Sequence, residues 1–169
     1  PVPVPIAGNL RFITVSAGGN HTCGVTENGT AYCWGANAAQ QLGSQASDRD
    51  CGVHLSACVS TPRSVATDLR FDFVTASSSA LRTATVVAGH TCGIATDGNV
   101  YCWGLNESGQ LGAHNDLTSA TPILLDEDLE FTKIDAGMAN TCGVTTDASM
   151  FCWQYGTPLD WWREFESSG

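Results

Sequence analysis

Short segments in which apolar residues alternate with small or polar ones recur three times along the chain. Each copy contains a Leu-x-Phe triplet, then a Thr-Cys-Gly segment followed by Val or Ile, and then an aromatic-Cys-Trp segment. The triplets begin at Leu10, Leu69 and Leu129. Short apolar runs bounded by turn residues are typical of β-strands. The pattern therefore predicts an all-β protein built from three copies of one antiparallel sheet.

The spacing of the copies indicates the kind of repeat. Phe12, Phe71 and Phe131 of the triplets are 59 and 60 residues apart. Each interval contains one insertion, and without the insertions the period is roughly 50 residues, which is typical of propeller blades or solenoid units. The predicted organisation is an extended linker, three repeats with two insertions, and an aromatic tail. The linker comprises residues 1–9, and the repeats comprise residues 10–68, 69–128 and 129–156. The insertions are residues 44–62 and 77–88, and the tail is residues 157–169.

The two regularly spaced cysteines of each copy are expected to face each other across a hairpin. If residues 27–29 form a three-residue loop, Cys23 lies opposite Cys33, at a Cα separation that a disulfide can span. Such a loop places its last residue in the left-handed region, which favours glycine. Gly29 and Gly98 stand there, whereas the third copy has Ala148. The register predicts three disulfides: Cys23–Cys33, Cys92–Cys102 and Cys142–Cys152.

The same register distributes apolar side chains over both faces of each sheet. Cys23 and Val25 share one face, and Gly24, Tyr32 and Trp34 share the other, where the aromatic ring opposite the glycine is expected to cover it. A sheet that is apolar on both faces fits a blade stacked between two neighbours. The first and third blades are then expected to expose an apolar face. Part of one face could be covered by the aromatic tail.

Charge and cysteine content restrict the function. The net charge of −10, from 17 acids and 7 bases, disfavours nucleic acid and anionic membranes as partners. No apolar stretch is long enough for a membrane-spanning helix, so no membrane insertion is expected. Eight cysteines, six of them with hairpin spacing, indicate a disulfide framework, and hence a secreted, extracellular or cell-surface protein. Zinc is the alternative for such cysteines, but opposed pairs across hairpins form poor tetrahedral sites, and we expect no metal and no cofactor.

The second copy resembles the regulator-of-chromosome-condensation repeat. Its residues His90-Thr91-Cys92, 97–106 and Gly109-Gln110-Leu111-Gly112 carry the resemblance, which extends over residues 10 to about 156. The resemblance implies a β-propeller with four-stranded antiparallel blades, of which this chain holds three. Its cysteine-bearing form is similar to repeats of secreted, mostly bacterial proteins. The third copy departs from the pattern, because Gln154-Tyr155-Gly156 replaces the Gly-Gln-Leu-Gly element.

The first insertion is the leading candidate for a binding loop, because inserted loops on a rigid scaffold often carry function. Cys51 and Cys58 in it are interpreted as a fourth disulfide, and a metal site formed by Cys51, His54 and Cys58 is the alternative. The second insertion is interpreted as a longer connection. The candidate contact residues of the first insertion are Asp48, Arg49, Asp50, His54 and Leu55.

Other notable residues receive structural interpretations. The tail reads as a short helix, and Trp161, Trp162 and Phe165 are candidate docking residues. His21 and His90 share a repeat position with Asn140, which favours hydrogen bonding to the backbone over ligation or proton transfer. Asp126-Glu127-Asp128 is interpreted as a solvated acidic loop. Asn20, Asn28 and Asn106 begin glycosylation sequons, which matter only in a eukaryotic source.

No catalytic motif stands out, and the chain is predicted to be non-enzymatic. The leading hypothesis is an extracellular interaction module that engages protein or polysaccharide. The protein partner is either further blades of its own polypeptide, a second copy or an extracellular ligand. One alternative is a structural subunit whose open blades assemble into a ring or filament. A GTPase exchange factor is a further alternative from the resemblance, and disulfides argue against the cytosolic setting it requires.

Overall fold

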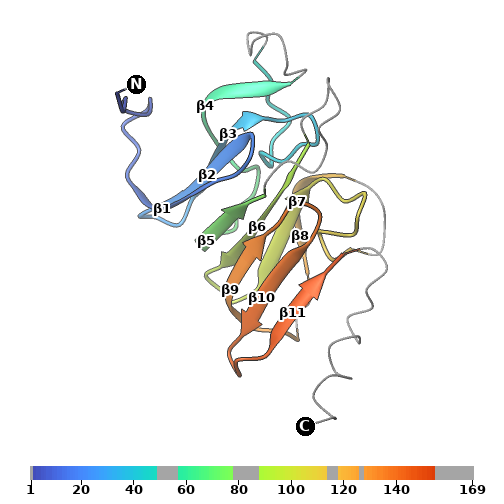
Figure 1. Ribbon diagram of the computed structural model, residues 1–169. Coiled ribbons are helices and arrows are strands. Elements are labelled where there is room, and N and C mark those ends of the chain that lie inside the picture. Colours follow the sequence, from blue (N-terminus) through green and yellow to red (C-terminus); the bar gives the residue numbers. More distant parts are fainter. Residues whose placement is uncertain (1, 49–56, 78–87, 114–117, 126–127, 155–169) are drawn as a thin grey trace.

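The computed structural model describes residues 2–48, 57–77, 88–113, 118–125 and 128–154, and these residues form three antiparallel sheets (Figure 1). The strand orders are β1-β2-β3-β4, β5-β6-β7-β8 and β11-β10-β9. The all-β prediction is confirmed. Four strands per sheet hold for the first two repeats, whereas the third shows three strands within the described residues. The strands are β1 Phe12–Ala17, β2 His21–Thr26, β3 Ala31–Ala36, β4 Cys58–Ser64, β5 Phe71–Ala76, β6 His90–Ala95, β7 Val100–Gly104, β8 Ser119–Leu124, β9 Phe131–Ala136, β10 Thr141–Thr145 and β11 Met150–Trp153.

The central hairpin of each sheet has the register that the loop chemistry predicts. Cys23 pairs with Cys33 in the first repeat, and the corresponding cysteines pair in the other two. The last loop residue adopts a positive φ in every copy: 79° at Gly29, 87° at Gly98 and 69° at Ala148. The three-residue loop therefore fixes the register even in the third repeat, where a residue with a Cβ occupies the left-handed position.

The ring that covers the hairpin glycine is not the one that the sequence indicates. A Cβ atom on Gly24 would lie 2.7 Å from the ring of Phe12, which comes from the first strand. Tyr32, directly opposite Gly24, instead meets the Phe12 ring edge-on at 6.2 Å between centroids. The same arrangement recurs around Gly93 and Gly143. The glycine makes room for the Phe of its own blade, so the Leu-x-Phe triplet is part of the blade interior.

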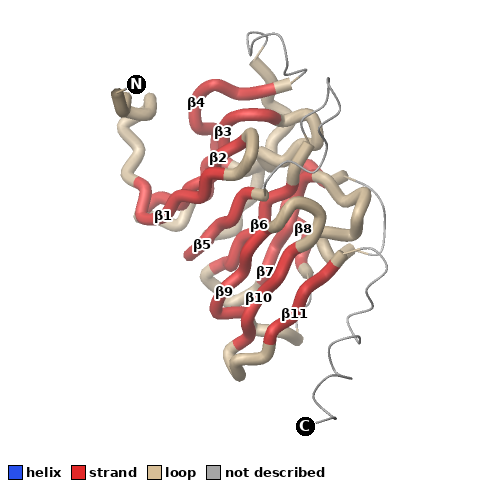
Figure 2. Tube along the Cα trace, viewed as in Figure 1, coloured by secondary structure: helices blue, strands red, loops and turns tan. Residues whose placement is uncertain are grey.

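The three sheets stack in sequence, and the core lies between them (Figure 2). We call the face of each sheet that carries the two hairpin cysteines its cysteine face. In the first sheet this face, with Cys23 and Cys33, packs against Phe71, Val74 and Trp103 of the second sheet. The cysteine face of the second sheet packs against Phe131, Ile134 and Trp153 of the third. At both junctions, the earlier blade presents its cysteine face and the later blade presents the face that carries its Phe and Trp, the Phe/Trp face.

The first blade leaves its Phe/Trp face partly open. Trp103 is fully buried and Trp153 is 3% exposed, whereas Trp34 at the same repeat position is half-buried. Ile13 and Val15, on β1, are 60% and 63% exposed. Within the part of the chain that the structure describes, no helix is long and apolar enough to cross a membrane.

Candidate interaction surfaces

The loop that follows β3 contains Gln41-Leu42-Gly43, and we call it the Gln-Leu-Gly loop. Two amide side chains hold it in one shape. Asn37 accepts the N–H of Leu42 at its Oδ1 atom at 3.1 Å and donates from Nδ2 to the carbonyl of Ser44 at 2.9 Å. Gln41 accepts the N–H of Ala39 at its Oε1 atom at 2.9 Å. These bonds satisfy a buried loop backbone and orient the main-chain carbonyl of Gln41.

The second repeat builds the same loop. Asn106 accepts the N–H of Leu111 at 2.9 Å, and the Gln110 side chain accepts the N–H of Ser108 at 2.8 Å. Asn106 and Gln110 are both fully buried. The sequon asparagine Asn106 is therefore part of the loop framework, whereas Asn20 and Asn28 are exposed.

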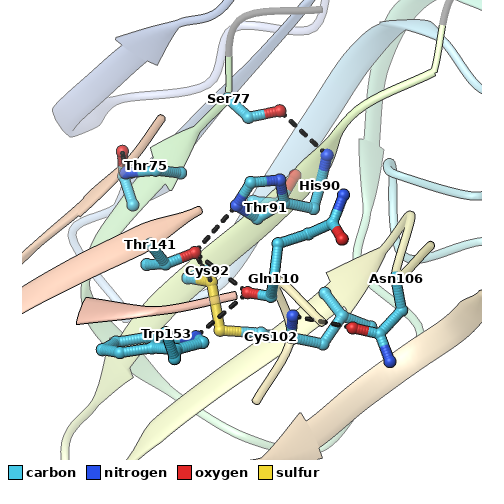
Figure 3. Close-up of a disulfide and its surroundings, with 12 residues drawn as sticks. Thr75, Ser77, His90, Thr91, Cys92, Cys102, Asn106, Gln110, Thr141 and Trp153 are labelled. Carbon is cyan, nitrogen blue, oxygen red and sulfur yellow. Dashed lines mark hydrogen bonds between the residues drawn. A yellow bond between two sulfur atoms is a disulfide. The ribbon is translucent and has the colours of Figure 1, made fainter. Parts of the chain in front are cut away.

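The carbonyl that each loop presents receives two donors from the next blade. The carbonyl oxygen of Gln41 accepts the Thr91 hydroxyl at 2.8 Å and the Trp103 indole N–H at 3.0 Å. At the second junction, shown in Figure 3, the Gln110 carbonyl accepts Thr141 and Trp153 at 3.0 Å each. One main-chain oxygen at each of the two junctions thus joins consecutive blades, and its donors stand at fixed repeat positions.

A buried histidine completes each junction. His21 Nε2 lies 2.9 Å from Thr91 Oγ1, and His90 Nε2 lies 2.8 Å from Thr141 Oγ1. Because each threonine gives its only hydroxyl proton to the glutamine carbonyl, Nε2 of the histidine is the donor and carries the proton. The histidines are structural, as expected, but a threonine hydroxyl of the next blade accepts this bond.

Burial keeps both imidazoles neutral. Desolvation lowers the pKa of His21 to about 4, and the neighbouring backbone of His90, which favours the charged imidazole, offsets part of this lowering. Desolvation together with the charge of His21 lowers the pKa of His90 to about 3. Groups with such low pKa values are uncharged near pH 7, where they act as hydrogen-bond donors.

A second polar contact joins the first strands of consecutive blades. Ser16 Oγ accepts the N–H of Ala76 at 3.0 Å, and Thr75 Oγ1 accepts the N–H of Ala136 at 3.2 Å. Thr75 also donates to Asp135 at 3.3 Å, and Asp135 occupies the position of Ser16 and Thr75 in its own repeat. The acceptor side chain at this position therefore belongs to the earlier blade and the N–H group to the later one.

The hairpin disulfides lie on the cysteine faces, with Cα–Cα distances of 4.0 to 4.1 Å. The first two are fully buried under the next blade, whereas Cys142 and Cys152 are partly exposed. Cys58 is also disulfide-bonded, and its expected partner, Cys51, lies outside the described residues. A bonded sulfur is not the thiolate that a metal needs, and no group of metal-ligating residues is found in the described ranges.

Of the first insertion, the structure describes the two ends, residues 44–48 and 57–62, which we call its base. Asp48 links these two ends by hydrogen bonds. The N–H of Asp48 donates to the Cys58 carbonyl at 2.7 Å, and its carboxylate accepts the Ser60 N–H at 3.0 Å. Hydrogen bonds from Ser60, with Arg63 3.8 Å away, lower the pKa of the Asp48 carboxyl. Asp48 therefore fixes the point where the loop leaves the sheet. The remaining candidates lie outside the described residues: Arg49, Asp50, His54 and Leu55 of the loop, and Trp161, Trp162 and Phe165 of the tail.

Stacked antiparallel blades joined in this way define a partial β-propeller. Two segments, residues 12–41 and 85–110, match the sequence profile of the regulator of chromosome condensation (RCC1) repeat. The Arabidopsis thaliana ultraviolet-B receptor UVR8 is 29% identical over 123 residues, which cover 73% of this chain and 24% of UVR8. The first two repeats are therefore similar in sequence to the RCC1 repeat.

Solved structures agree on the fold. Human WBSCR16 superposes with a TM-score of 0.67 at 21% identity, over 88% of this chain and 34% of that one. A chain in the structure of Kap60 bound to yeast RCC1 (Prp20) gives a TM-score of 0.66 at 21% identity, over 88% and 31%. The chain thus spans about a quarter to a third of the length of these relatives.

The His–Thr–carbonyl–Trp junction was not predicted from sequence, although its residues recur at fixed positions. Thr22, Thr91 and Thr141 each precede a hairpin cysteine, and Trp34, Trp103 and Trp153 each follow one. The recurrence shows that these positions matter to the repeat. The partner of each residue depends on how blades stack, and the sequence of one repeat does not contain that information.

Proposed function

We propose that this chain is a non-catalytic, protein-binding part of a disulfide-stapled β-propeller that works outside the reducing cytosol. The observation that carries the proposal is the cysteine chemistry. Three hairpin disulfides and a disulfide-bonded Cys58 account for every described cysteine. Disulfides persist in secreted and cell-surface proteins and are rare in the cytosol.

Protein is the favoured partner class. One RCC1-like propeller, yeast RCC1 (Prp20), has been solved bound to Kap60, and its binding to Gsp1p and histones is described. The net charge of −10 argues against nucleic acid here. The base of the first insertion is anchored at Asp48 and Cys58 at one end of the first blade, and this supports the insertion as the contact region.

The location is tested by the thiol state of the protein in its native compartment. Rapid acid quenching followed by alkylation and intact mass should show four disulfides and no alkylated thiol. Two or more alkylated thiols in the folded protein would contradict the extracytosolic assignment.

Binding is tested with a photo-crosslinking residue at Leu55, in the insertion. The matched control is the same residue at Glu27, which is exposed in the hairpin turn at the other end of the first sheet. Saturable crosslinks to one extracellular protein at Leu55, absent at Glu27, are expected. Equal labelling at both positions, or none at Leu55, would remove the insertion from the binding surface.

A further inference from the structure

The first blade repeats the residues of a junction but lacks the neighbour that would complete it. Four positions that are buried in the second and third repeats are open in the first. Thr91, Trp103 and Phe71 are at most 1% exposed, and Ala76 is 7% exposed. Their counterparts in the first repeat are half-buried or exposed: Thr22, Trp34, Phe12 and Ala17.

Three of these four open positions, all but Phe12, carry hydrogen-bond donors. Within the described residues, neither the Thr22 hydroxyl nor the Trp34 indole N–H has a hydrogen-bond partner, although Thr91 and Trp103 share the Gln41 carbonyl. The N–H of Gly18 donates to the carbonyl of His21. By the alternation of antiparallel hydrogen bonds, the N–H of Ala17 therefore points away from β2. Ala76 and Ala136 point the same group at the previous blade.

The ring cluster on this face is already arranged as it is in the buried blades. Phe12 lies 5.7 Å from Trp34 between ring centroids, and Phe71 lies 5.8 Å from Trp103. The half-exposed face therefore has the form of the two faces that are covered by a cysteine face. No rearrangement of the first blade is needed to receive one.

We infer that the open face of the first blade binds a further blade of this repeat class, one that presents a Gln-Leu-Gly carbonyl to Thr22 and Trp34. The inference rests on the proposed propeller function. That blade also supplies a histidine to Thr22 and a hydroxyl or carboxylate to the Ala17 N–H. The apolar part of the contact is the cysteine face of the incoming blade, laid on Phe12 and Trp34.

A second copy of this chain does not meet these requirements. Its first two Gln-Leu-Gly carbonyls are occupied by the donors of the following blades. Its third repeat has Gln154-Tyr155-Gly156 in place of the loop motif. The Asn140 side-chain oxygen, at the histidine position, fills the place that a Cβ atom of Gly137 would take, within its own turn. The occupant is therefore a repeat with an intact loop and histidine, and the chain does not stack head to tail on itself.

The test places such a blade in front of the first repeat, where it replaces residues 1–9. A copy of residues 69–128, which carries His90 and Gln110, is placed directly before Leu10, in the register in which Leu129 follows the second repeat. A second version uses residues 10–68, in case the first does not fold. Hydrogen exchange of peptides covering Phe12–Ala17 and Ala31–Ala36 is compared with that of the original chain.

Exchange in β1 is expected to slow by about tenfold or more when the added blade covers it. Peptides from β11, at the far end of the stack, are the internal control and should not change. Thr22→Val should reverse part of the protection in the extended chain and have no effect on the original one. Trp34→Phe is the corresponding test of the indole donor.

Two results would overturn the inference. One is unchanged exchange in β1 while both added blades are folded and oxidised. The other is protection of β1 in the original chain that rises with protein concentration, since a second copy would then be the occupant. Neither readout depends on an extracellular ligand or on cell compartment, so failure here is distinct from failure of the proposed function.

Discussion

The Nε2 atom of His90 lies 2.8 Å from the hydroxyl oxygen of Thr141 in the next blade, and both side chains are completely buried. His21 and Thr91 form the same contact one repeat earlier, at 2.9 Å. The junction thus depends on imidazoles that stay neutral in the folded chain, whereas the unfolded chain protonates histidine near pH 6.5.

Acid should therefore destabilise the chain in a window set by these histidines. Their folded pKa values are lowered to about 4 and about 3, so the unfolded state binds more protons than the folded state below pH 6.5. The stabilisation is complete above pH 6.5 and is lost as the pH falls from there toward 3. Urea unfolding at pH 7, 6 and 5 is expected to show a falling free energy of unfolding.

His90→Asn separates this effect from carboxylate titration, and Asn140 shows that the repeat accepts asparagine at this position. The variant should be less stable at pH 7, and its free energy of unfolding should depend less steeply on pH between 7 and 5. An unchanged slope would show that His90 does not titrate on unfolding.

The threonine hydroxyl at the junction has a matched control within the chain. Thr91→Val removes the donor to Gln41 and the acceptor of the His21 N–H, and should cost about 2–3 kcal/mol because buried polar groups are left unpaired. Thr22→Val makes the same change on the open face and should cost less than about 0.5 kcal/mol. Denaturant midpoints measure both. Equal losses would mean that the inter-blade bonds contribute nothing particular.

The hairpin turns provide a second matched pair. Ala148 has a φ of 69°, so Ala148→Gly should be neutral or stabilising by up to about 1 kcal/mol. Gly98 has a φ of 87°, with open space around the Cβ position, so Gly98→Ala should cost about 1 kcal/mol from backbone strain alone. Thermal unfolding checks both signs, and a loss of stability for Ala148→Gly would contradict the left-handed turn.

The third disulfide should be the first to be reduced. Cys23–Cys33 and Cys92–Cys102 are fully buried, whereas Cys142 and Cys152 are partly exposed on the cysteine face of the last sheet. Limited treatment of the folded chain with a phosphine, followed by alkylation and peptide mapping, should label Cys142 and Cys152 before the other two pairs. Uniform labelling would indicate that reduction follows global unfolding.

The sequence predicted what a single repeat determines locally. The hairpin register around Cys23 and Cys33 followed from loop length and a left-handed residue at position 29, both of which are nearest-neighbour properties. Cross-strand pairing within the hairpin favours Tyr32 as the cover of Gly24, whereas the ring that lies there, Phe12, comes from the first strand, outside the hairpin. The registers of the first strands shift near Phe12 and Phe71, which alternation alone does not reveal.

The junction could not be predicted for a different reason. The hydroxyl of Thr91 contacts a histidine 70 residues earlier and a carbonyl 50 residues earlier. Identical residues in each copy allow a bond within a repeat or a bond to either neighbouring repeat, and the sequence does not distinguish them. Only the stacking of the sheets determines that the hydrogen-bond partners of Thr91 lie in the preceding blade.

The acceptor at each junction, the main-chain oxygen of Gln41 or Gln110, cannot be deleted by any side-chain replacement. Mutations can reach it only indirectly, through the amides that shape the loop, such as Asn37 and Asn106. The donors Thr91 and Trp103, in contrast, are each lost by one codon change. Tolerance to mutation therefore differs between the two sides of the interface. Substitutions in the earlier blade leave the acceptor oxygen in place, whereas single substitutions in the later blade remove a donor.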